Sequence, residues 1–519
     1  MKVLGIYGSI LFDGSSEQSY IHDAGATLFI DGEHICSIQE ERLSGLKYDG
    51  RFPEKSIDYV LDEVPRDDIN LVIFVDIGIE DWVKSLQKGE PNTFLEKMFP
   101  NADVGFISHH QAHAYSSIFT QESNEGVCIV IDGGGCHNWV GQDTLGLEKC
   151  SLVYFNKRKG LFRYIPFNGE WGLLYQLWSH HIFCKKTNSN INEKDTKYHC
   201  TFAGKIMGLA AYGSGNNKIK MYDFGQYFPQ VLFGMRDPDF IPIGPEDKAE
   251  LLQYNFEESL LELLERFDED YLEPVVCLTG GVFLNINVNT KIVKKFKNRK
   301  FHITPFVSDC GLSYGAAAFG ASLWNDVKVP SNLALLGKSY ATPENNLDLK
   351  KVAQYLEDGK IVAWYQGRTE FGPRALGSRS ILMSAKHKEN KDILNEKVKH
   401  REEWRPFAGV ILKNYLNDYF EEGIESPYML YSQTVKEDKR DKIPAITHVD
   451  NTCRIQTVGE GILSELLEEY YKISKVPVLL NTSFNDNGKP IVETPEDAIQ
   501  SFNDMNIDYL VLNNTIITK

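Results

Sequence analysis

One local pattern, a short β-rich run that ends in a glycine turn, constrains the fold of this chain more than any other feature. Residues 127–131 (Val-Cys-Ile-Val-Ile) lead into Asp132-Gly-Gly-Gly, and residues 275–278 (Val-Val-Cys-Leu) lead into Thr279-Gly-Gly. Stretches of helical composition separate such runs, which predicts a mixed α/β fold. Because the same unit returns far along the chain, we also expect a duplicated nucleotide-binding fold whose loops face one cleft.

Two further signals organise the chain. Residues 26–30 and 35–38 are β-rich and flank Asp31-Gly32, which predicts a β-hairpin. Residues 327–347 are rich in Pro, Asn and Ser, which indicates a linker. At 519 residues the chain is long enough for two or three domains on either side of such a linker.

Composition excludes several classes of protein. The formal net charge of −17 argues against a general binder of nucleic acid or of anionic membranes. No run approaches the roughly 18 apolar residues that cross a bilayer. The nine cysteines include no Cys-x-x-Cys pair, which favours reduced thiols and a cytoplasmic location. For a protein of this size a homodimer is the default expectation.

A histidine pair is the first candidate site. His109 and His113 stand four residues apart, so on a helix both imidazoles project from one face and can bind one metal. A metalloprotease would need Glu where His110 stands, which argues against proteolysis. Asp132 and Asp309 occupy glycine-rich turns and complete an N/O ligand set that suits iron, manganese or zinc better than magnesium alone. The alternative is a pair of histidines without a ligand role.

Glycine loops form the second candidate group. The glycines that follow Asp132, and Gly280-Gly281, let backbone N–H groups approach a phosphate. Either loop alone could be a plain tight turn. The string from Gly204 to Gly213 sets three glycines around Lys205 but lacks Walker A spacing, so it is not a P-loop.

The last third of the chain carries a local excess of positive charge. Residues 360–413 contain 12 Lys and Arg against 6 Asp and Glu, inside an otherwise acidic chain. Guanidinium, ammonium and hydroxyl groups bind phosphoryl oxygens and a planar carbamate. The alternatives are solvated surface lysines and ordinary salt bridges. The candidates are Arg374, Arg379, Lys399, Arg405, Arg454, Asn481 and Ser483.

Taken together these strings resemble the O-carbamoyltransferase family of nodulation-factor and antibiotic-tailoring enzymes. The resemblance runs nearly end to end and is most specific in Glu370-Phe-Gly-Pro-Arg-Ala-Leu-Gly and Asn481-Thr-Ser-Phe-Asn. It also includes His22-Asp23, Glu40-Glu-Arg42, the His109/His113 pair, Gly204-Lys205 to Tyr212-Gly213, Gly280-Gly-Val-Phe-Leu-Asn285, Arg405-Pro-Phe-Ala and His448-Val-Asp450.

The resemblance implies two domains and two chemical steps. Residues 1–340 would be an actin-like ATPase domain and residues 349–519 a YrdC-like, α+β domain. The second domain would form carbamoyl-adenylate and pyrophosphate from carbamoyl phosphate and Mg-ATP. Arg374, Arg405, Arg454, Asn481 and Ser483 would hold these substrates, with Arg379 and Lys399 in support, because two polyanions meet only where fixed cations offset their repulsion.

The first domain would then transfer the carbamoyl group to a hydroxyl of a small-molecule or sugar-containing acceptor in natural-product biosynthesis. His109, His113, Asp132 and Asp309 match the family's metal ligands, with iron the expected metal. His113, Asp132, Gly133, Gly134, Gly135, Gly281 and Asn285 would seat the adenylate. His22 matches the general base, and Lys47 lies where the family contacts the acceptor. Cys310 departs from the pattern, because we expect a polar or acidic residue beside Asp309.

Three alternatives stay open. A tRNA threonylcarbamoyl-transfer enzyme shares the metal motif, but the C-terminal strings and the acidic charge disfavour it. A small-molecule kinase of the actin-like superfamily would not need the histidine pair, and it would release ADP in place of AMP and pyrophosphate. A non-catalytic nucleotide-binding module would not need so complete a set of polar site residues.

Overall fold

The chain forms two compact units. The computed structural model describes residues 1–10, 21–75, 89–133, 149–167, 169–189, 191, 199–218, 220, 241–268, 273–340 and 347–519. The first unit comprises Met1–Ser44 and Tyr48–Leu333, and the second comprises Gly45–Lys47 and Ala334–Lys519. Both mix helices with sheets, which confirms the predicted α/β class. None of the helices in these ranges is long and apolar enough to span a bilayer.

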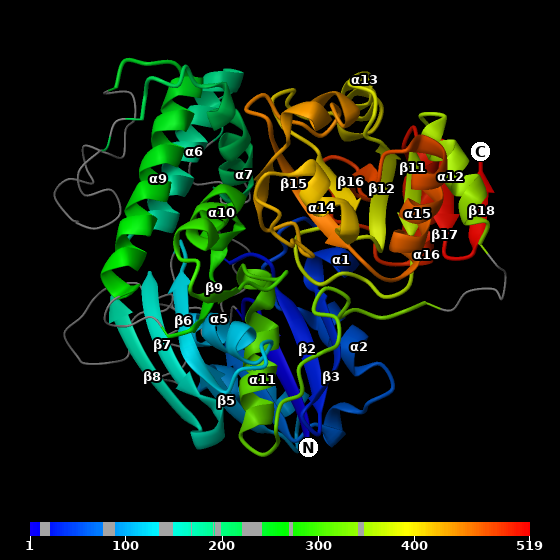
Figure 1. Cartoon of the computed structure of the whole chain (residues 1–519). Coiled ribbons are helices and arrows are strands. Elements are labelled where there is room, and N and C mark those ends of the chain that lie inside the picture. The colour runs from blue at the N-terminus through cyan, green and yellow to red at the C-terminus, as the bar shows by residue number, and fades with distance from the viewer. Residues whose placement is uncertain are drawn as a thin grey trace. The chain divides into compact units, whose positions relative to one another are not determined.

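The described part of the first unit contains two five-stranded sheets (Figure 1). One has the order β3-β2-β1-β4-β5, with β1 Lys2–Tyr7, β2 Gly25–Ile30, β3 Glu33–Gln39, β4 Leu71–Val75 and β5 Asp103–Ile107. The other has the order β10-β9-β6-β7-β8, with β6 Glu125–Ile131, β7 Cys150–Asn156, β8 Leu161–Phe167, β9 Val275–Thr279 and β10 Lys300–His302.

The two sheets have one topology. In each, the first three strands in chain order form an antiparallel meander, and the fourth strand pairs in parallel with the first. The fifth strand then extends the parallel side. The expected duplication is therefore present in the backbone, although no sequence identity between the halves reveals it. The predicted hairpin is also present: Asp31 and Gly32 turn β2 into β3 with φ values of 51° and 80°, as a two-residue hairpin loop requires.

Two helices lie between the sheets of the first unit: one packs on each sheet, and the two helices pack on each other. A Cβ on Gly5 of β1 would lie 2.4 Å from the Ala317 nitrogen, so only glycine admits helix α11 (Leu312–Ser322) onto this strand. A Cβ on Gly315 would lie 1.9 Å from the Ala112 oxygen, so α11 also touches helix α5 (His109–Ile118) directly. These close approaches bring the ends of α5 and α11 together.

The remaining helices of the first unit cover the first sheet and lie beside the second. Ile57, Val60 and Leu61 pack on the strands of the first sheet, opposite α11. Trp171 donates to Ser259 Oγ at 2.9 Å, which joins two long helices beside the second sheet. The described helices are α1 Glu40–Ser44, α2 Glu54–Leu61, α4 Glu90–Met98, α6 Trp171–Thr187, α7 His199–Leu209, α9 Pro245–Asp268 and α10 Ile286–Lys295.

The second unit is one eight-stranded sheet covered on both faces. Its order is β14-β15-β13-β16-β12-β11-β17-β18. The strands are β11 Val362–Tyr365, β12 Arg379–Ser384, β13 Ala408–Leu412, β14 Ser432–Thr434, β15 Thr452–Val458, β16 Val478–Ser483, β17 Tyr509–Leu512 and β18 Thr515–Thr518.

Alternation along the strands of the second unit sets its two cores. Val362 and Trp364 face one core together with helices α12 (Leu349–Glu357) and α15 (Ile462–Ser474). Ala363 and Tyr365 face the other, which includes Ala498 and Phe502 of α16 (Pro495–Asp504). The shorter helices are α13 Glu389–Leu394 and α14 Leu416–Tyr419.

Candidate metal centre and cationic cluster

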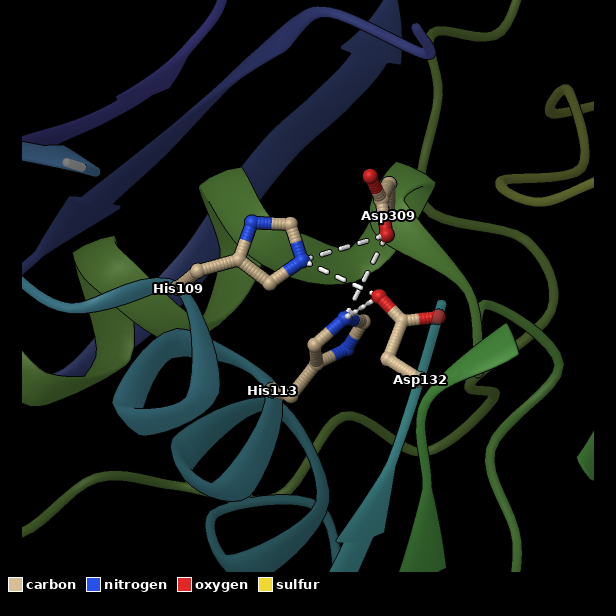
Figure 2. Close-up of side chains that lie close together, drawn as sticks. All are labelled: His109, His113, Asp132 and Asp309. Atoms are coloured by element: carbon tan, nitrogen blue, oxygen red, sulfur yellow. Dashed lines mark hydrogen bonds and ion pairs between the residues drawn. The ribbon is translucent and has the colours of Figure 1, made fainter. Parts of the chain in front are cut away.

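Helix α5 presents the histidine pair. Ser108 caps it: its Oγ accepts from the Gln111 N–H at 3.2 Å, and Gln111 Oε1 accepts from the Ser108 N–H at 3.0 Å. This capping box begins the helix at His109, so His109 and His113 fall on one face one turn apart. Figure 2 shows both imidazoles turned toward the same point.

Two carboxylates meet these imidazoles. Asp132 follows the last residue of β6, and its Oδ2 lies 3.2 Å from His109 Nε2 and 3.4 Å from His113 Nε2. Asp309 stands in the turn before α11, and its Oδ1 lies 3.4 Å from His109 Nε2 and 3.3 Å from His113 Nε2. All four side chains are almost completely buried. The structure thus brings together the four residues named from the sequence (Figure 2).

The charges in this cluster support one another. Burial alone would lower the pKa of His109, but the carboxylates of Asp309 and Asp132 outweigh it and raise that pKa to about 10. The same carboxylates raise the pKa of His113. Burial would raise the pKa of each carboxyl group, but the histidines hold the pKa values of both Asp132 and Asp309 below their usual range. The two carboxylates are therefore ionised, and an ion that bound here would take the place of the protons on the two imidazoles.

The donor geometry fits one divalent ion. Protein atoms that bind one ion at about 2.0–2.2 Å stand about 3.0–3.4 Å apart at adjacent positions of its shell. The four nitrogen–oxygen separations of 3.2–3.4 Å match this spacing, and all four ligand atoms lie within 4.8 Å of one another. His113 Nε2 is buried and faces both carboxylate oxygens without a hydrogen bond of good geometry to either, which suits a ligand atom of a shared ion. Two imidazoles and two carboxylates suit iron, manganese or zinc.

His22 borders this cluster. Its Nδ1 lies 3.2 Å from Asp23 Oδ2, and its Nε2 lies 3.7 Å from Asp309 Oδ2. The His22 side chain is 26% exposed, so a substrate can still reach it. Asp23 adopts a left-handed backbone conformation (φ 60°), which is uncommon outside glycine and marks this turn as constrained. Cys310 contributes no ligand atom to the group; its buried thiol lies 3.2 Å from Ser308 Oγ, and burial raises its pKa.

The residues expected to seat an adenylate have other contacts. The Gly281 N–H donates to Asp132 Oδ1 at 3.0 Å, and a Cβ there would lie 2.8 Å from that oxygen. Asn285 caps α10 and exchanges two hydrogen bonds with Gln253. Gly133 closely approaches the amide of Gln176. Gly281 and Asn285 thus shape the site from behind, a role the motif did not predict. Gly134 and Gly135 lie outside the described residues.

In the second unit a carboxylate organises the arginine-bearing loop. Glu370 Oε1 accepts from the backbone N–H groups of Leu376, Ser378 and Arg379 at 2.7–3.0 Å. This nest folds the Glu-Phe-Gly-Pro-Arg-Ala-Leu-Gly string into a fixed turn around Arg374. Glu370 is only 1% exposed, so water does not compete for these three hydrogen bonds.

Four guanidinium groups gather in this unit. Burial lowers the pKa of Arg454, and the charges of Arg374, Arg401 and Arg405 lower it further. Burial, with a contribution from Arg405, lowers the pKa of Arg401 to about 9. Arg405 Nη1 lies 3.4 Å from Glu402 Oε2, but no described carboxylate pairs with Arg401 or Arg454. Closely spaced, half-buried guanidinium groups of this kind, with Glu402 as a carboxylate neighbour of Arg405, are expected where an anion binds.

Arg379 and Lys399 are bound to the protein itself. Arg379 is fully buried, stacks 3.6 Å from the Tyr365 ring and donates through all three guanidinium nitrogens to protein oxygens. Lys399 Nζ donates to the Ser483 carbonyl at 2.6 Å and to Asn485. Both side chains therefore hold loops in place, which limits their part in ligand binding to support.

The other predicted residues of this unit lie near one another in the sheet. Asn481 on β16 donates to Gln456 Oε1 at 3.0 Å, while its buried Oδ1 has no protein partner among the described residues. Ser483, two residues on, donates to Asn485 Oδ1 at 2.6 Å. Lys47 is half-buried in the segment Gly45–Lys47, which groups with the second unit.

Sequence reasoning missed two side chains. Tyr7 donates to Asp309 Oδ2 at 3.0 Å, although the two residues are 302 positions apart. An aromatic residue at the end of a strand gives no sign of such a contact. Arg401 stacks 3.9 Å from the Phe407 ring and donates to the Pro406 carbonyl, beside the other arginines. The spacing of Arg401 and Arg405 was visible, but an arginine near a tryptophan and two glutamates is indistinguishable from a surface residue.

Comparison with known proteins matches a family model to part of each unit. The family model described as "Carbamoyltransferase C-terminus" matches residues 353–519, and "Carbamoyltransferase N-terminus" matches residues 15–98 and 234–318. Nodulation protein U of Sinorhizobium fredii is 37% identical over 79% of this chain and 77% of its own length. Nodulation protein NolNO of the same species is 28% identical over 100% of this chain and 83% of its own.

The chain resembles solved structures only with low TM-scores. Full-length HypF in a phosphate- and nucleotide-bound form is 11% identical, with a TM-score of 0.36 over 63% of this chain and 56% of its own. A likeness of this size supports no conclusion about the chain.

Proposed function

The chain belongs to the carbamoyltransferase family, and on this premise we propose an ATP-dependent O-carbamoyltransferase that works in two steps. In the first, carbamoyl phosphate loses its phosphate to water, and the resulting carbamate oxygen attacks the α-phosphorus of Mg-ATP. Pyrophosphate leaves and carbamoyl-adenylate remains. In the second, an acceptor hydroxyl attacks the carbamoyl carbon, AMP leaves, and an O-carbamate forms.

The observation that carries this proposal for the first step is the cluster of half-buried arginines. Arg374, Arg405 and Arg454 would neutralise the phosphates of ATP and carbamoyl phosphate, with Arg401 as a fourth cation. A bound anion would offset the repulsion among these arginines that lowers the pKa of Arg454, and this would favour phosphate binding. Asn481 Oδ1 offers an acceptor for a ribose or an adenine N–H.

The second step uses the histidine–carboxylate cluster. His109, His113, Asp132 and Asp309 would hold a divalent ion, with iron expected and manganese or zinc as alternatives. When bound, such an ion supplies Lewis-acid polarisation of a carbonyl oxygen. The protein contributes the rigid cage, because each carboxylate turns one oxygen to both imidazoles.

His22 is positioned for proton transfer. With its Nδ1–H directed to Asp23, the lone pair of Nε2 is left to take the proton of the acceptor hydroxyl as it attacks. Lys47 would contact the acceptor. The loop of Gly133, Gly134 and Gly135 would seat the adenylate, while Gly281 and Asn285 keep Asp132 and helix α10 in place behind it.

We assign residues 1–340 to an actin-like fold and residues 349–519 to a YrdC-like fold. The repeated topology of the two five-stranded sheets supports the first assignment. The acceptor is a hydroxylated small molecule or sugar, because His22 is a base suited to an alcohol and no described feature favours nucleic acid.

One assay tests the reaction. The protein is incubated with Mg-ATP and carbamoyl phosphate, and pyrophosphate, AMP and ADP are measured, with omission of carbamoyl phosphate as the control. We expect pyrophosphate that depends on carbamoyl phosphate. Release of ADP would support the kinase alternative, and no nucleotide turnover at all would refute the first step. Mass spectrometry over a panel of hydroxylated metabolites, seeking the gain of one carbamoyl group, then identifies the acceptor.

A further inference from the structure

The two carboxylate oxygens of Asp132 have different partners. Its Oδ2 faces His109 and His113, whereas its Oδ1 accepts a hydrogen bond from the Gly281 N–H at 3.0 Å. The backbone amide therefore fixes the rotation of this carboxylate and leaves one oxygen for the centre of the cluster. Outer hydrogen bonds of this kind orient ligands and tune metal affinity.

The carboxylate of Asp309 is arranged in the same way, but its donor is a side chain. Oδ1 faces the two imidazoles, and Oδ2 accepts from the Tyr7 hydroxyl at 3.0 Å. The two carboxylates thus stand on either side of the histidines as near equivalents. Gly281 from one half of the duplicated fold and Tyr7 from the other supply the matching donors.

Tyr7 is built firmly into this place. It is the last residue of β1, its side chain is almost fully buried, and its ring meets that of His109 edge-on with centroids 5.9 Å apart. The hydroxyl has no freedom to turn toward solvent. His22 Nε2 lies 3.7 Å from the same Asp309 Oδ2, so this oxygen stands between the Tyr7 hydroxyl and the proposed general base.

We propose that Tyr7 is a positioning residue that keeps Asp309 a one-oxygen ligand of the metal centre and keeps Oδ2 away from the ion. The proposal rests on the metal site of the proposed function. Without the Tyr7 hydroxyl, Asp309 is free to turn and bind an ion through both oxygens.

The test replaces only the hydroxyl. Tyr7→Phe and wild-type protein are stripped of metal and titrated with Co²⁺, and affinity is measured by chelator competition and coordination by the visible spectrum. We expect Tyr7→Phe to bind Co²⁺ about 10- to 100-fold more weakly, the usual effect of losing an outer-shell partner. We also expect weaker visible bands, because a second Asp309 oxygen raises the coordination number. Tyr314→Phe is the matched control, since its buried hydroxyl has no hydrogen-bond partner among the described residues.

The outcomes distinguish the role of Tyr7 from the proposed metal site on which it rests. Wild-type affinity and an unchanged Co²⁺ spectrum in Tyr7→Phe would overturn the role of Tyr7 and leave the metal site intact. Absence of Co²⁺ binding in the wild-type protein would overturn both. If Tyr7→Phe does not fold, 4-aminophenylalanine at position 7 keeps a donor on the ring, and wild-type affinity and spectrum are then expected, whereas 4-fluorophenylalanine should show the loss.

Discussion

Lys399 donates to both oxygens that Asn485 offers, the backbone carbonyl at 2.8 Å and the side-chain Oδ1 at 2.9 Å. Its third hydrogen bond reaches the Ser483 carbonyl, so one buried ammonium holds the whole Asn-Thr-Ser-Phe-Asn turn. Burial lowers the pKa of Lys399, yet the three acceptors satisfy every N–H of the charged form.

Lys399→Met should therefore loosen this turn. Three oxygens lose the ammonium as a donor, and Asn485 Oδ1 keeps another, the Ser483 hydroxyl, so we expect the free energy of unfolding to fall by about 1–3 kcal/mol. Pyrophosphate formation should fall with it, because Ser483 and Asn481 lie on the same strand and turn. Urea denaturation and the pyrophosphate assay measure the two effects. Lys397→Met, an exposed neighbour in the same segment, is the control and should change neither.

His22→Ala separates the two chemical steps. The imidazole lies beside Asp23 and Asp309 of the first unit, whereas the proposed first step uses the arginines of the second unit, so pyrophosphate formation should continue. Transfer to the acceptor should slow about 10²- to 10⁴-fold, the usual contribution of a general base. Both rates are measured in one preparation, so the first step serves as the internal control. An equal loss of both steps would refute the division of labour.

Removal of transition metal should have the same selective effect. 2,2′-Bipyridine binds iron and zinc but leaves Mg-ATP intact, so treated protein should still release pyrophosphate. Carbamoyl transfer should stop and should return on addition of Fe²⁺. Transfer that persists in fully stripped protein would show that His109, His113, Asp132 and Asp309 form an ion-pair cluster without a ligand role.

Arg401→Gln tests the cation that sequence reasoning missed. Its guanidinium is buried beside Arg405 and Arg454 without a carboxylate partner, so its loss should weaken binding of the phosphorylated substrates. A charge-assisted hydrogen bond contributes about 1.5–3 kcal/mol, which predicts a rise in KM of about 10- to 100-fold. Arg158→Gln in the first unit is the control, because it lies outside this cluster. An unchanged KM for both ATP and carbamoyl phosphate would exclude Arg401 from the site.

The sequence predicted what depends on local spacing. The mixed fold and the hairpin at Asp31-Gly32 follow from strand runs and turn residues, and the helical spacing of His109 and His113 correctly placed them side by side. The sequence could not show which N–H groups already donate hydrogen bonds to other residues of the protein. The Gly281 N–H, expected for a ligand, holds Asp132, because only the folded chain brings these residues, 149 positions apart, together.

Long-range partners explain the other gaps. Arg379 matched a substrate-binding motif, but its neighbours in space, the carbonyls of Gln366 and Glu493, use its N–H groups. Tyr7 matched nothing, because an aromatic residue at the end of a buried strand is normally part of the core. The ligand roles of the named residues remain predictions for the assays above.

His302 makes acid stability testable. Its Nε2 lies 2.9 Å from Thr120 Oγ1, and burial, helped by Lys300 and Lys157, lowers its pKa to about 4. Because the unfolded chain takes up this proton near pH 6.5, the unfolded state binds more protons between about pH 6.5 and 4, and stability is lost as the pH falls through that window. His302→Gln should remove up to about 3 kcal/mol of this acid loss. Urea denaturation of both proteins at pH 7.5 and 4.5 measures this difference, because the contributions of all other groups cancel between the two proteins. An equal loss of stability in both would show that His302 is not the group that titrates.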